Sequence, residues 1–314
     1  MSAPILITGA GGCIGAWVIK QLLDSGTEVI AFDLSAERRR LALLCDDAAA
    51  ADTVVWETGD IADGGRVTEI FARYRPAAVI HLAALQVPFC KADPAAGARV
   101  NVVGSVNVFE AARRYGVDRI AYASSVAATA MGESPWLETL YGAYKICNEQ
   151  TARVYWRDWQ IPSIGIRPAV VYGVARDQGM SAAPTVAMLA AVAQRSFVIP
   201  FSGAVGLVYA AEAAAVFIRA IAVAQEGAQV FNLNGVQKSV AEVVDMIQQH
   251  YPNAEVSYGG AALPFPSDLS DEPLRACIGD YHRRSFAEGV DETLSLFARR
   301  VAAGRIAFPE DTHI

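Results

Sequence analysis

Residues 5–15 of the 314-residue chain read Ile5-Leu6-Ile7-Thr8-Gly9-Ala10-Gly11-Gly12-Cys13-Ile14-Gly15. A short apolar strand runs directly into a glycine cluster, and from residue 14 to residue 23 apolar side chains recur at helical spacing. In a strand, turn and helix of this kind, the free N–H groups at the helix start attract the phosphates of a dinucleotide. The stretch therefore predicts the beginning of a doubly wound α/β fold.

The three motif glycines have different expected roles. Gly9 permits the tight turn, Gly12 lets the backbone approach a pyrophosphate, and Gly15 lets the helix lie close to the sheet. Together with Cys13 and Ile14 they are the expected phosphate contacts. Because a glycine turn also occurs without a ligand, the prediction depends on the residues that follow.

An acidic residue, Asp33, stands where the second apolar strand, residues 29–32, ends. A carboxylate at this position accepts hydrogen bonds from both ribose hydroxyls of an adenosine and repels the extra phosphate of NADP, so the sequence predicts NAD. The alternative is a strand-end aspartate in an ordinary turn. Arg38, Arg39 and Arg40 follow closely; we expect a solvated helix face, although phosphate-binding arginines would weaken the preference for NAD.

Strands and helices alternate through the first half of the chain, which predicts a parallel Rossmann sheet covered on both faces. Further strands are expected at 54–56, 78–82, 120–123 and 163–166, with helices at 67–74, 95–115 and 141–159. Later elements are helices at 187–194, 212–224, 240–250 and 290–303, and strands at 205–208 and 230–233. We predict an NAD-binding domain at 1–172, to which 205–238 returns, and a smaller C-terminal substrate-binding lobe at 173–204 and 239–314.

Composition excludes several classes of protein. Lys plus Arg is 26 and Asp plus Glu is 33, a net charge of −7, which is unfavourable for binding nucleic acid or an anionic membrane. The longest uncharged runs, 178–194 and 196–211, are broken by proline and glycine, and no basic segment precedes the first apolar stretch, so we expect neither a membrane span nor a signal peptide. Five scattered cysteines without a CxxC pair predict free thiols, no metal site and a cytoplasmic location.

Residues 141–145, Tyr-Gly-Ala-Tyr-Lys, place Tyr141 and Lys145 on one face of a helix. An ammonium and a cationic nicotinamide near a phenol lower its pKa from about 10 towards neutrality. Such a tyrosine can exchange a proton with a substrate hydroxyl while hydride moves to or from the cofactor. Tyr144 has no partner at this spacing, because position 148 is Asn148.

The expected fifth strand ends at Ser124-Ser125. Open α/β sheets place their sites at the carboxyl ends of the strands, so a hydroxyl here can hold a substrate oxygen beside the phenol. The alternative is a serine pair that merely begins a loop. The residues alone leave open which serine acts.

Taken together, the motifs resemble the extended short-chain dehydrogenase/reductase superfamily, in its NAD-dependent epimerase/dehydratase branch. The resemblance covers residues 5 to about 175 in order, and the ordered set is specific although each motif alone is weak. Its parts are the glycine turn, Asp33, Gly59-Asp60-Ile61, His81-Leu82-Ala83-Ala84, Asn101-Val102-Val103-Gly104-Ser105, Ser124-Ser125, residues 141–145, and Arg167-Pro168 before Val171-Tyr172-Gly173.

The resemblance implies NAD across the sheet edge, substrate between two lobes, and a homodimer formed by the helices at 95–115 and 141–159. It assigns Tyr141 as acid/base, Lys145 to the nicotinamide ribose and to tuning Tyr141, and Asn101 to steadying the proton relay. Ser125 is the expected catalytic serine, with Ser124 as the alternative, although the family loop carries a tyrosine that residues 125–132 lack. The other implied cofactor contacts are Asp60, Ile61, Leu82, Ala83 and Ala84.

The second half departs from the nucleotide-sugar members of this branch. They carry an asparagine after the sixth strand, whereas residues 167–170 here are Arg-Pro-Ala-Val, and the late arginines at 275, 283 and 284 lie outside a convincing nucleotide-binding motif. We therefore expect a small hydroxylated substrate, such as a sugar, sugar acid or hydroxy acid. The loop residues expected to face it are Gln86, Lys91, Arg176, Asp177 and Gln178, of which Gln86 and Arg176 are the predicted contacts, with Ser124 and Ser125.

Three functional interpretations remain open. The first is an NAD-dependent dehydrogenase or reductase that acts on such a substrate. The second is a sugar or nucleotide-sugar epimerase or dehydratase that retains its NAD. The third, a non-catalytic NAD-sensing protein, gives no reason for the serine, tyrosine and lysine set.

Overall fold

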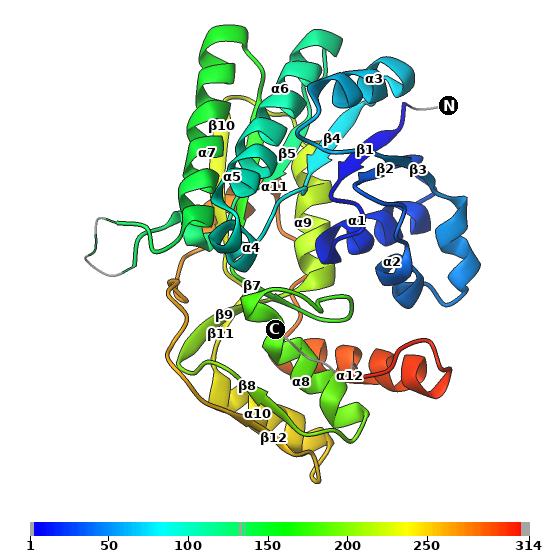
Figure 1. Cartoon of the computed structure of the whole chain (residues 1–314), viewed down its shortest axis with the longest axis vertical. Helices are drawn as coiled ribbons and strands as arrows, with labels where there is room; N and C mark the ends of the chain where they lie inside the picture. Colours follow the sequence, from blue (N-terminus) through cyan, green and yellow to red (C-terminus); the bar gives the residue numbers. More distant parts are fainter. Residues whose placement is uncertain (1–2, 132–133, 135, 309–314) are drawn as a thin grey trace.

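A computed structural model describes residues 3–131, 134 and 136–308. Seven parallel strands form its central sheet in the order β3-β2-β1-β4-β5-β6-β10 (Figure 1). These strands are β1 (Ile5–Thr8), β2 (Val29–Asp33), β3 (Val55–Thr58), β4 (Ala78–His81), β5 (Ile120–Ala123), β6 (Ser163–Pro168) and β10 (Ala228–Leu233). The expected doubly wound fold is therefore confirmed.

Helices cover both faces of this sheet because its strand side chains alternate between two apolar cores. In β1, Ile7 lies in the core that contains residues of α1 and α9, whereas Leu6 lies in the core formed with α3, α6 and α7. The helices around the central sheet are α1 (Cys13–Asp24), α2 (Arg39–Leu44), α3 (Gly64–Tyr74), α4 (Val87–Ala92), α5 (Pro94–Ala98), α6 (Gly104–Tyr115), α7 (Leu140–Trp159) and α9 (Ala210–Ala222).

A smaller group of elements lies beyond the carboxyl ends of the central strands (Figure 1). β7, β9 and β11 form one small sheet and β8 and β12 another, while α8, α10 and α12 pack together. The bounds are β7 (Val170–Tyr172), α8 (Ala183–Val192), β8 (Phe197–Ile199), β9 (Ala204–Tyr209), β11 (Val236–Ser239), α10 (Val240–His250), β12 (Val256–Tyr258), α11 (Glu272–Ile278) and α12 (Phe286–Ala302). The residue-level division into lobes stays a prediction.

The expected helix at 95–115 is interrupted. Residues 94–98 form α5, Arg99–Val103 form a π-helical segment, and only then does α6 begin. Inside this segment the Asn101 amide donates to the Gly97 carbonyl, while the Asn101 carbonyl accepts from Ser105 and Asn148. Side-chain hydrogen bonds of this kind compete with the regular helical pattern, and apolar spacing does not reveal them. Helices α4 and α11 were also not expected, whereas α2 begins at Arg39, within the arginines for which a helix face was expected.

Helix α7 is fixed at both its beginning and its middle. Thr139 caps it by accepting a hydrogen bond from the Gly142 N–H. A Cβ at Gly142 would lie 2.1 Å from the Ala127 carbonyl oxygen, so only glycine allows the helix to approach the loop after β5 this closely. Further along, Glu149 is 1% exposed and receives two hydrogen bonds from Arg167 on β6. These contacts set where Tyr141 and Lys145 stand.

The close approach at Gly142 predicts that Gly142→Ala moves α7 away from the loop. Relieving such overpacking costs about 1–3 kcal/mol of unfolding free energy. Urea denaturation would measure this loss. The control is Ala143→Gly at the neighbouring exposed position, which we expect to cost at most about 1 kcal/mol. Equal stability of wild type and Gly142→Ala would contradict the prediction.

Candidate active site

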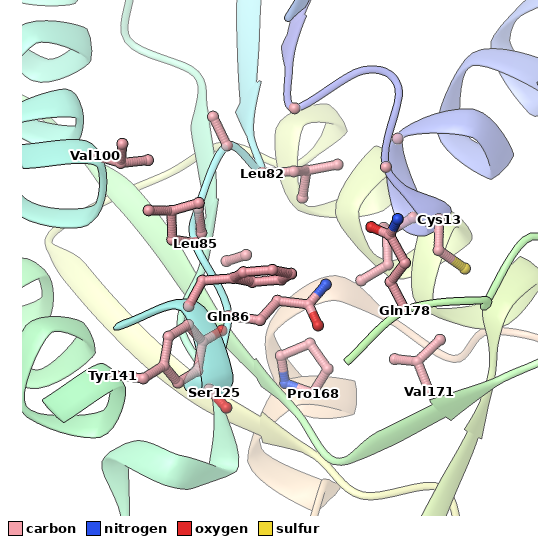
Figure 2. Close-up of a pocket in the computed structure, with 18 of the residues that line it drawn as sticks. Cys13, Leu82, Leu85, Gln86, Val100, Ser125, Tyr141, Pro168, Val171 and Gln178 are labelled. Atoms are coloured by element: carbon pink, nitrogen blue, oxygen red, sulfur yellow. The ribbon is translucent and has the colours of Figure 1, made fainter. Parts of the chain in front are cut away.

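A cavity of about 520 Å³ lies at the carboxyl edge of the central sheet, between the glycine turn and the loops that follow β4, β5 and β7. Figure 2 shows Tyr141 and Ser125 together on one side of it, Cys13 and Gln178 on the other, and Gln86 between them. Of the predicted catalytic, cofactor and substrate contacts, all but Asn101 line the cavity, whereas the loop residues Lys91 and Asp177, which were expected to face the substrate, do not. Those that do are Gly9, Gly12, Cys13, Ile14, Gly15, Asp33, Asp60, Ile61, Leu82, Ala83, Ala84, Gln86, Ser124, Ser125, Tyr141, Lys145 and Arg176.

The glycine turn has the geometry of a phosphate cradle. Gly9 has a φ of +69°, and a Cβ there would lie 2.6 Å from the Ala83 nitrogen. Gly12 is the N-cap of α1 without a side-chain cap, and a Cβ on it would meet only the Gly9 oxygen, at 3.1 Å, so the space beside it is open. A dinucleotide phosphate fits against a helix start that is left bare in this way.

Asp33 stands at the end of β2, beside this cradle. Its Oδ2 accepts from the Gly11 N–H at 2.8 Å and its Oδ1 from the Leu34 N–H at 2.7 Å. Two backbone donors hold the carboxylate towards the cavity that it lines, where a ribose would lie. The arrangement fits the adenosine half of NAD.

The arginines after Asp33 differ from the solvated face that we expected. Arg38 pairs with Asp52 at 2.5 Å, while Arg39 and Arg40 both pair with Asp177. Arg40 is 14% exposed and lines the cavity, a position that sequence reasoning missed. Its distant partner explains the omission, because no local pattern joins two residues 137 positions apart.

The two serines after β5 have different surroundings. Ser124 is 2% exposed, and its hydroxyl donates to the buried Glu149 carboxylate at 2.5 Å. Ser125 is half-buried beside Tyr141, and its hydroxyl accepts from the Ala127 N–H at 3.1 Å (Figure 2). Since Ser124 is committed to Glu149, Ser125 has the hydroxyl that is better placed for a ligand.

In the protein alone, the pKa of Tyr141 lies above its ordinary value of 10. Burial raises it to about 12, although a hydrogen bond with Ser125 and the charge of Arg176 act in the opposite direction. The Lys145 ammonium donates to the Ala123 carbonyl at 2.7 Å and lies 5.4 Å from the centre of the Tyr141 ring. Sequence spacing predicted the shared helix face, but it overlooked desolvation of the phenol.

Lys145 is itself buried, with 3% exposure, and burial lowers its pKa to about 8. Asn101 lies nearby in the fold without touching it: the amide of Asn101 donates to the Leu85 and Gly97 carbonyls and to the Cys90 sulfur. These contacts give Asn101 a structural role next to the site. Its part in a proton relay stays a prediction.

The substrate side of the cavity is mostly apolar with a few polar groups. Arg176 donates to Ser181 at 3.1 Å, and its buried Nε has no hydrogen-bond partner among the described residues. Lys91 is exposed and outside the lining, and Asp177 faces Arg39 and Arg40. Apolar lining residues that the sequence analysis missed are Val87, Pro88, Phe89, Val100, Met180 and Phe265.

The late arginines are paired with carboxylates of the same chain. Arg275 and Arg283 both pair with Asp271, and Arg284 pairs with Glu292 at 2.6 Å. None of the three lines the cavity. They therefore offer no free guanidinium to a ligand there.

Comparison with known proteins identifies the family. The model of the NAD dependent epimerase/dehydratase family matches residues 5–234. The chain belongs to this family. It is thus an NAD-dependent enzyme of the extended short-chain dehydrogenase/reductase type, and the expectations of family, enzyme class and cofactor are confirmed.

Two curated relatives show how far the likeness extends within the family. UDP-glucose 4-epimerase of Mycolicibacterium smegmatis is 32% identical over 183 residues, 55% of this chain and 57% of that protein. dTDP-glucose 4,6-dehydratase 1 of Escherichia coli is 36% identical over 116 residues, 35% of this chain and 31% of that protein. The chain spans about half the length of the first curated relatives that it matches.

Solved structures are similar over nearly the whole chain. UDP-glucose 4-epimerase of Thermotoga maritima, solved with UDP-glucose, has a TM-score of 0.81 at 22% identity and covers 95% of this chain and 99% of its own. L-threonine dehydrogenase of Clostridium difficile has a TM-score of 0.80 at 19% identity, with 95% and 98% covered. These likenesses show the fold, which epimerases and dehydrogenases share.

Metal-binding clusters and membrane-spanning helices are both absent from the residues that the structure describes. Within residues 3–131, 134 and 136–308, no group of three or more His, Cys, Asp or Glu side chains is arranged to hold a metal ion. No helix in the same part of the chain is long and apolar enough to cross a membrane.

The lowered pKa of Lys145 predicts a pH-dependent contribution to stability. Between about pH 8 and the ordinary lysine pKa of 10.5, the unfolded chain binds a proton that the native Lys145 does not. The unfolding free energy of wild type relative to Lys145→Met should therefore rise with pH, by up to about 1.4 kcal/mol per unit. Urea titrations from about pH 7.5 to 9.5 measure the difference, and a flat difference would refute the lowered pKa.

Proposed function

We propose that the protein is an NAD-dependent oxidoreductase that transfers hydride between NAD and a hydroxyl-bearing carbon of a small substrate, with Tyr141 as acid/base. The observation that supports this most is a single cavity with a phosphate cradle at one end and Ser125, Tyr141 and Lys145 at the other. A dinucleotide that spans the cavity leaves room beside the phenol for a small molecule.

When bound, NAD⁺ would supply the hydride acceptor and a positive charge that favours ionisation of the phenol. Ser125 holds the substrate oxygen, and Tyr141 takes the hydroxyl proton during oxidation or returns it during reduction. Because burial keeps the pKa of Tyr141 at about 12 in the protein alone, the phenol is protonated at neutral pH and ready to donate. Oxidation needs the phenolate, so its rate should rise with pH. Lys145 lowers the cost of that phenolate and orients the ribose.

The polar groups on the substrate side favour an acid, such as a hydroxy acid or a sugar acid. Arg176 lines the cavity together with Cys13 and Tyr141, and burial lowers the pKa of its guanidinium. A Cβ at Gly179 would lie 1.8 Å from the Gln86 oxygen and 3.5 Å from Arg176 Nη2, so Gln86 and Arg176 converge. A carboxylate bound between them would supply the partner that Arg176 Nε lacks.

A second candidate is a sugar or nucleotide-sugar epimerase or dehydratase that keeps NAD bound. The identity of 32% to a UDP-glucose 4-epimerase favours it. Against it stand the absence of an asparagine at residues 167–170 and the pairing of the late arginines with Asp271 and Glu292. Without an asparagine or free arginines to contact the nucleotide, the protein would gain little binding energy from that part of the substrate, which lies away from the reacting carbon.

The two candidates predict different behaviour in one experiment. A dehydrogenase should make NADH in proportion to substrate oxidised when hydroxy acids, sugar acids and sugars are offered with NAD⁺. It should purify largely free of NAD, and UDP-sugars should not raise its melting temperature, because a ligand held by the native state stabilises it. Tightly co-purified NAD with stabilisation by a UDP-sugar would favour the epimerase.

Tyr141→Phe keeps the ring but removes the transferable proton. We expect turnover to fall by roughly 10²- to 10⁴-fold while the NAD⁺ dissociation constant changes little. Steady-state kinetics and calorimetry measure the two effects. Tyr144→Phe on the same helix is the matched control and should retain turnover. Near wild-type turnover in Tyr141→Phe would disprove the assignment.

The oligomeric state forms part of the same proposal. Val103, Val154 and Trp159 are exposed apolar residues of the π-helical segment and α7. A two-fold pairing through this surface would cover them and give a homodimer. Light scattering should report twice the chain mass, and Val154→Glu should shift the protein to monomer. A wild-type monomer at micromolar concentration would contradict this assembly.

A further inference from the structure

The loop after β7 is joined to the start of α2 by charged hydrogen bonds. Asp177 Oδ1 accepts from Arg40 Nε at 2.8 Å, and its Oδ2 accepts from Arg39 Nη2 at 2.6 Å. Both carboxylate oxygens are therefore occupied by guanidinium groups from the region that follows Asp33. In the sequence, Asp177 follows Arg40 by 137 residues and Arg39 by 138 residues, so the contact is long-range.

This pairing is continuous with the site for the adenosine half of the cofactor. Arg40 Nη1 donates to the Gly11 carbonyl at 2.8 Å, and the N–H of Gly11 donates to Asp33 Oδ2, also at 2.8 Å. Arg40 lines the cavity together with Leu34 and Ser35, the residues directly after Asp33. Its charge thus stands beside the position where a ribose hydroxyl, or a phosphate ester on it, would lie.

The charges around this position decide between NAD and NADP. A ribose phosphate needs unengaged cations, and it is repelled by Asp33 and by the exposed Glu37. Arg40, which lines the cavity, could serve as such a cation, but Asp177 neutralises part of its charge and fixes its orientation. We propose that Asp177, on a remote loop, is a second determinant of NAD preference that acts by engaging Arg40.

Two separate barriers then exclude NADP. Replacing Asp33 removes the repelling carboxylate but leaves Arg40 engaged. Replacing Asp177 frees Arg40 but leaves the carboxylate. Each single change should therefore have a small effect, and the double change an effect larger than the product of the two, because the freed guanidinium group can bind a phosphate favourably only after Asp33 is gone.

The test is binding of NAD⁺ and NADP⁺ by calorimetry, which needs no substrate and is independent of the proposed reaction. We expect Asp33→Ser and Asp177→Asn each to tighten NADP⁺ binding by about threefold, and the double variant by roughly 30- to 100-fold. NAD⁺ binding to Asp177→Asn should stay within about threefold of wild type. A double variant that binds NADP⁺ no better than Asp33→Ser would overturn the proposal.

Two controls separate this mechanism from a general change in charge. Asp52→Asn frees Arg38, which does not line the cavity, so NADP⁺ binding should not change. Adding Arg40→Met to the double variant should abolish most of its gain.

A further variant keeps the test decisive if Asp177→Asn does not fold. In the Asp33→Ser background, Arg40→Met should leave NADP⁺ binding unchanged, because Arg40 is already engaged by Asp177. A clear loss of NADP⁺ affinity in this variant would show that Arg40 is free to bind phosphate and would refute the proposal.

Discussion

The buried carboxylate of Glu149 holds the catalytic end of the molecule together. It accepts two hydrogen bonds from Arg167 on β6 and one from Ser124 after β5, so one side chain of α7 joins the helix to two strands. Removing one partner from a buried pair of this kind typically costs about 3–5 kcal/mol, because an uncompensated charge remains. With α7 held here, Tyr141 and Lys145 face the same cavity as Ser125. The position of Tyr141, the proposed acid/base group, thus depends on this structural contact.

This contact also shows where sequence reasoning succeeds and where it ends. The glycine turn, Asp33 and the Tyr141–Lys145 spacing are local patterns in the sequence. The residues that form them, Gly9, Gly12, Gly15, Asp33, Tyr141 and Lys145, line the cavity. The choice between Ser124 and Ser125 was not decided by a local pattern, because it depends on Glu149, 25 residues away. The sequence predicts that both serines lie at the carboxyl edge of the sheet, but it does not predict the direction in which each hydroxyl points.

Long-range charge pairing limited the prediction in the same way. The arginines after β2 were interpreted as a solvated face, since nothing near them in sequence indicates Asp177 as a partner. The π-helical segment around Asn101 was missed because hydrogen bonds from side chains outside the apolar pattern stabilise it. The burial of Tyr141, which raises its pKa in the protein alone, could not be predicted for a related reason: spacing reports a neighbouring charge, whereas burial depends on the whole fold.

The cations that line the cavity differ in whether a carboxylate of the chain pairs with them. Arg40 is engaged by Asp177, while Lys145 and Arg176 line the cavity without an ion pair among the described residues. Lys145 lies beside the phenol, 5.4 Å from the centre of the Tyr141 ring, where the substrate hydroxyl would lose its proton in the proposed oxidation. A carboxylate substrate would neutralise Arg176 and remove one charge that favours the phenolate. Lys145 would then be the cation left to stabilise ionised Tyr141, which accounts for a buried ammonium held against a backbone carbonyl at that position.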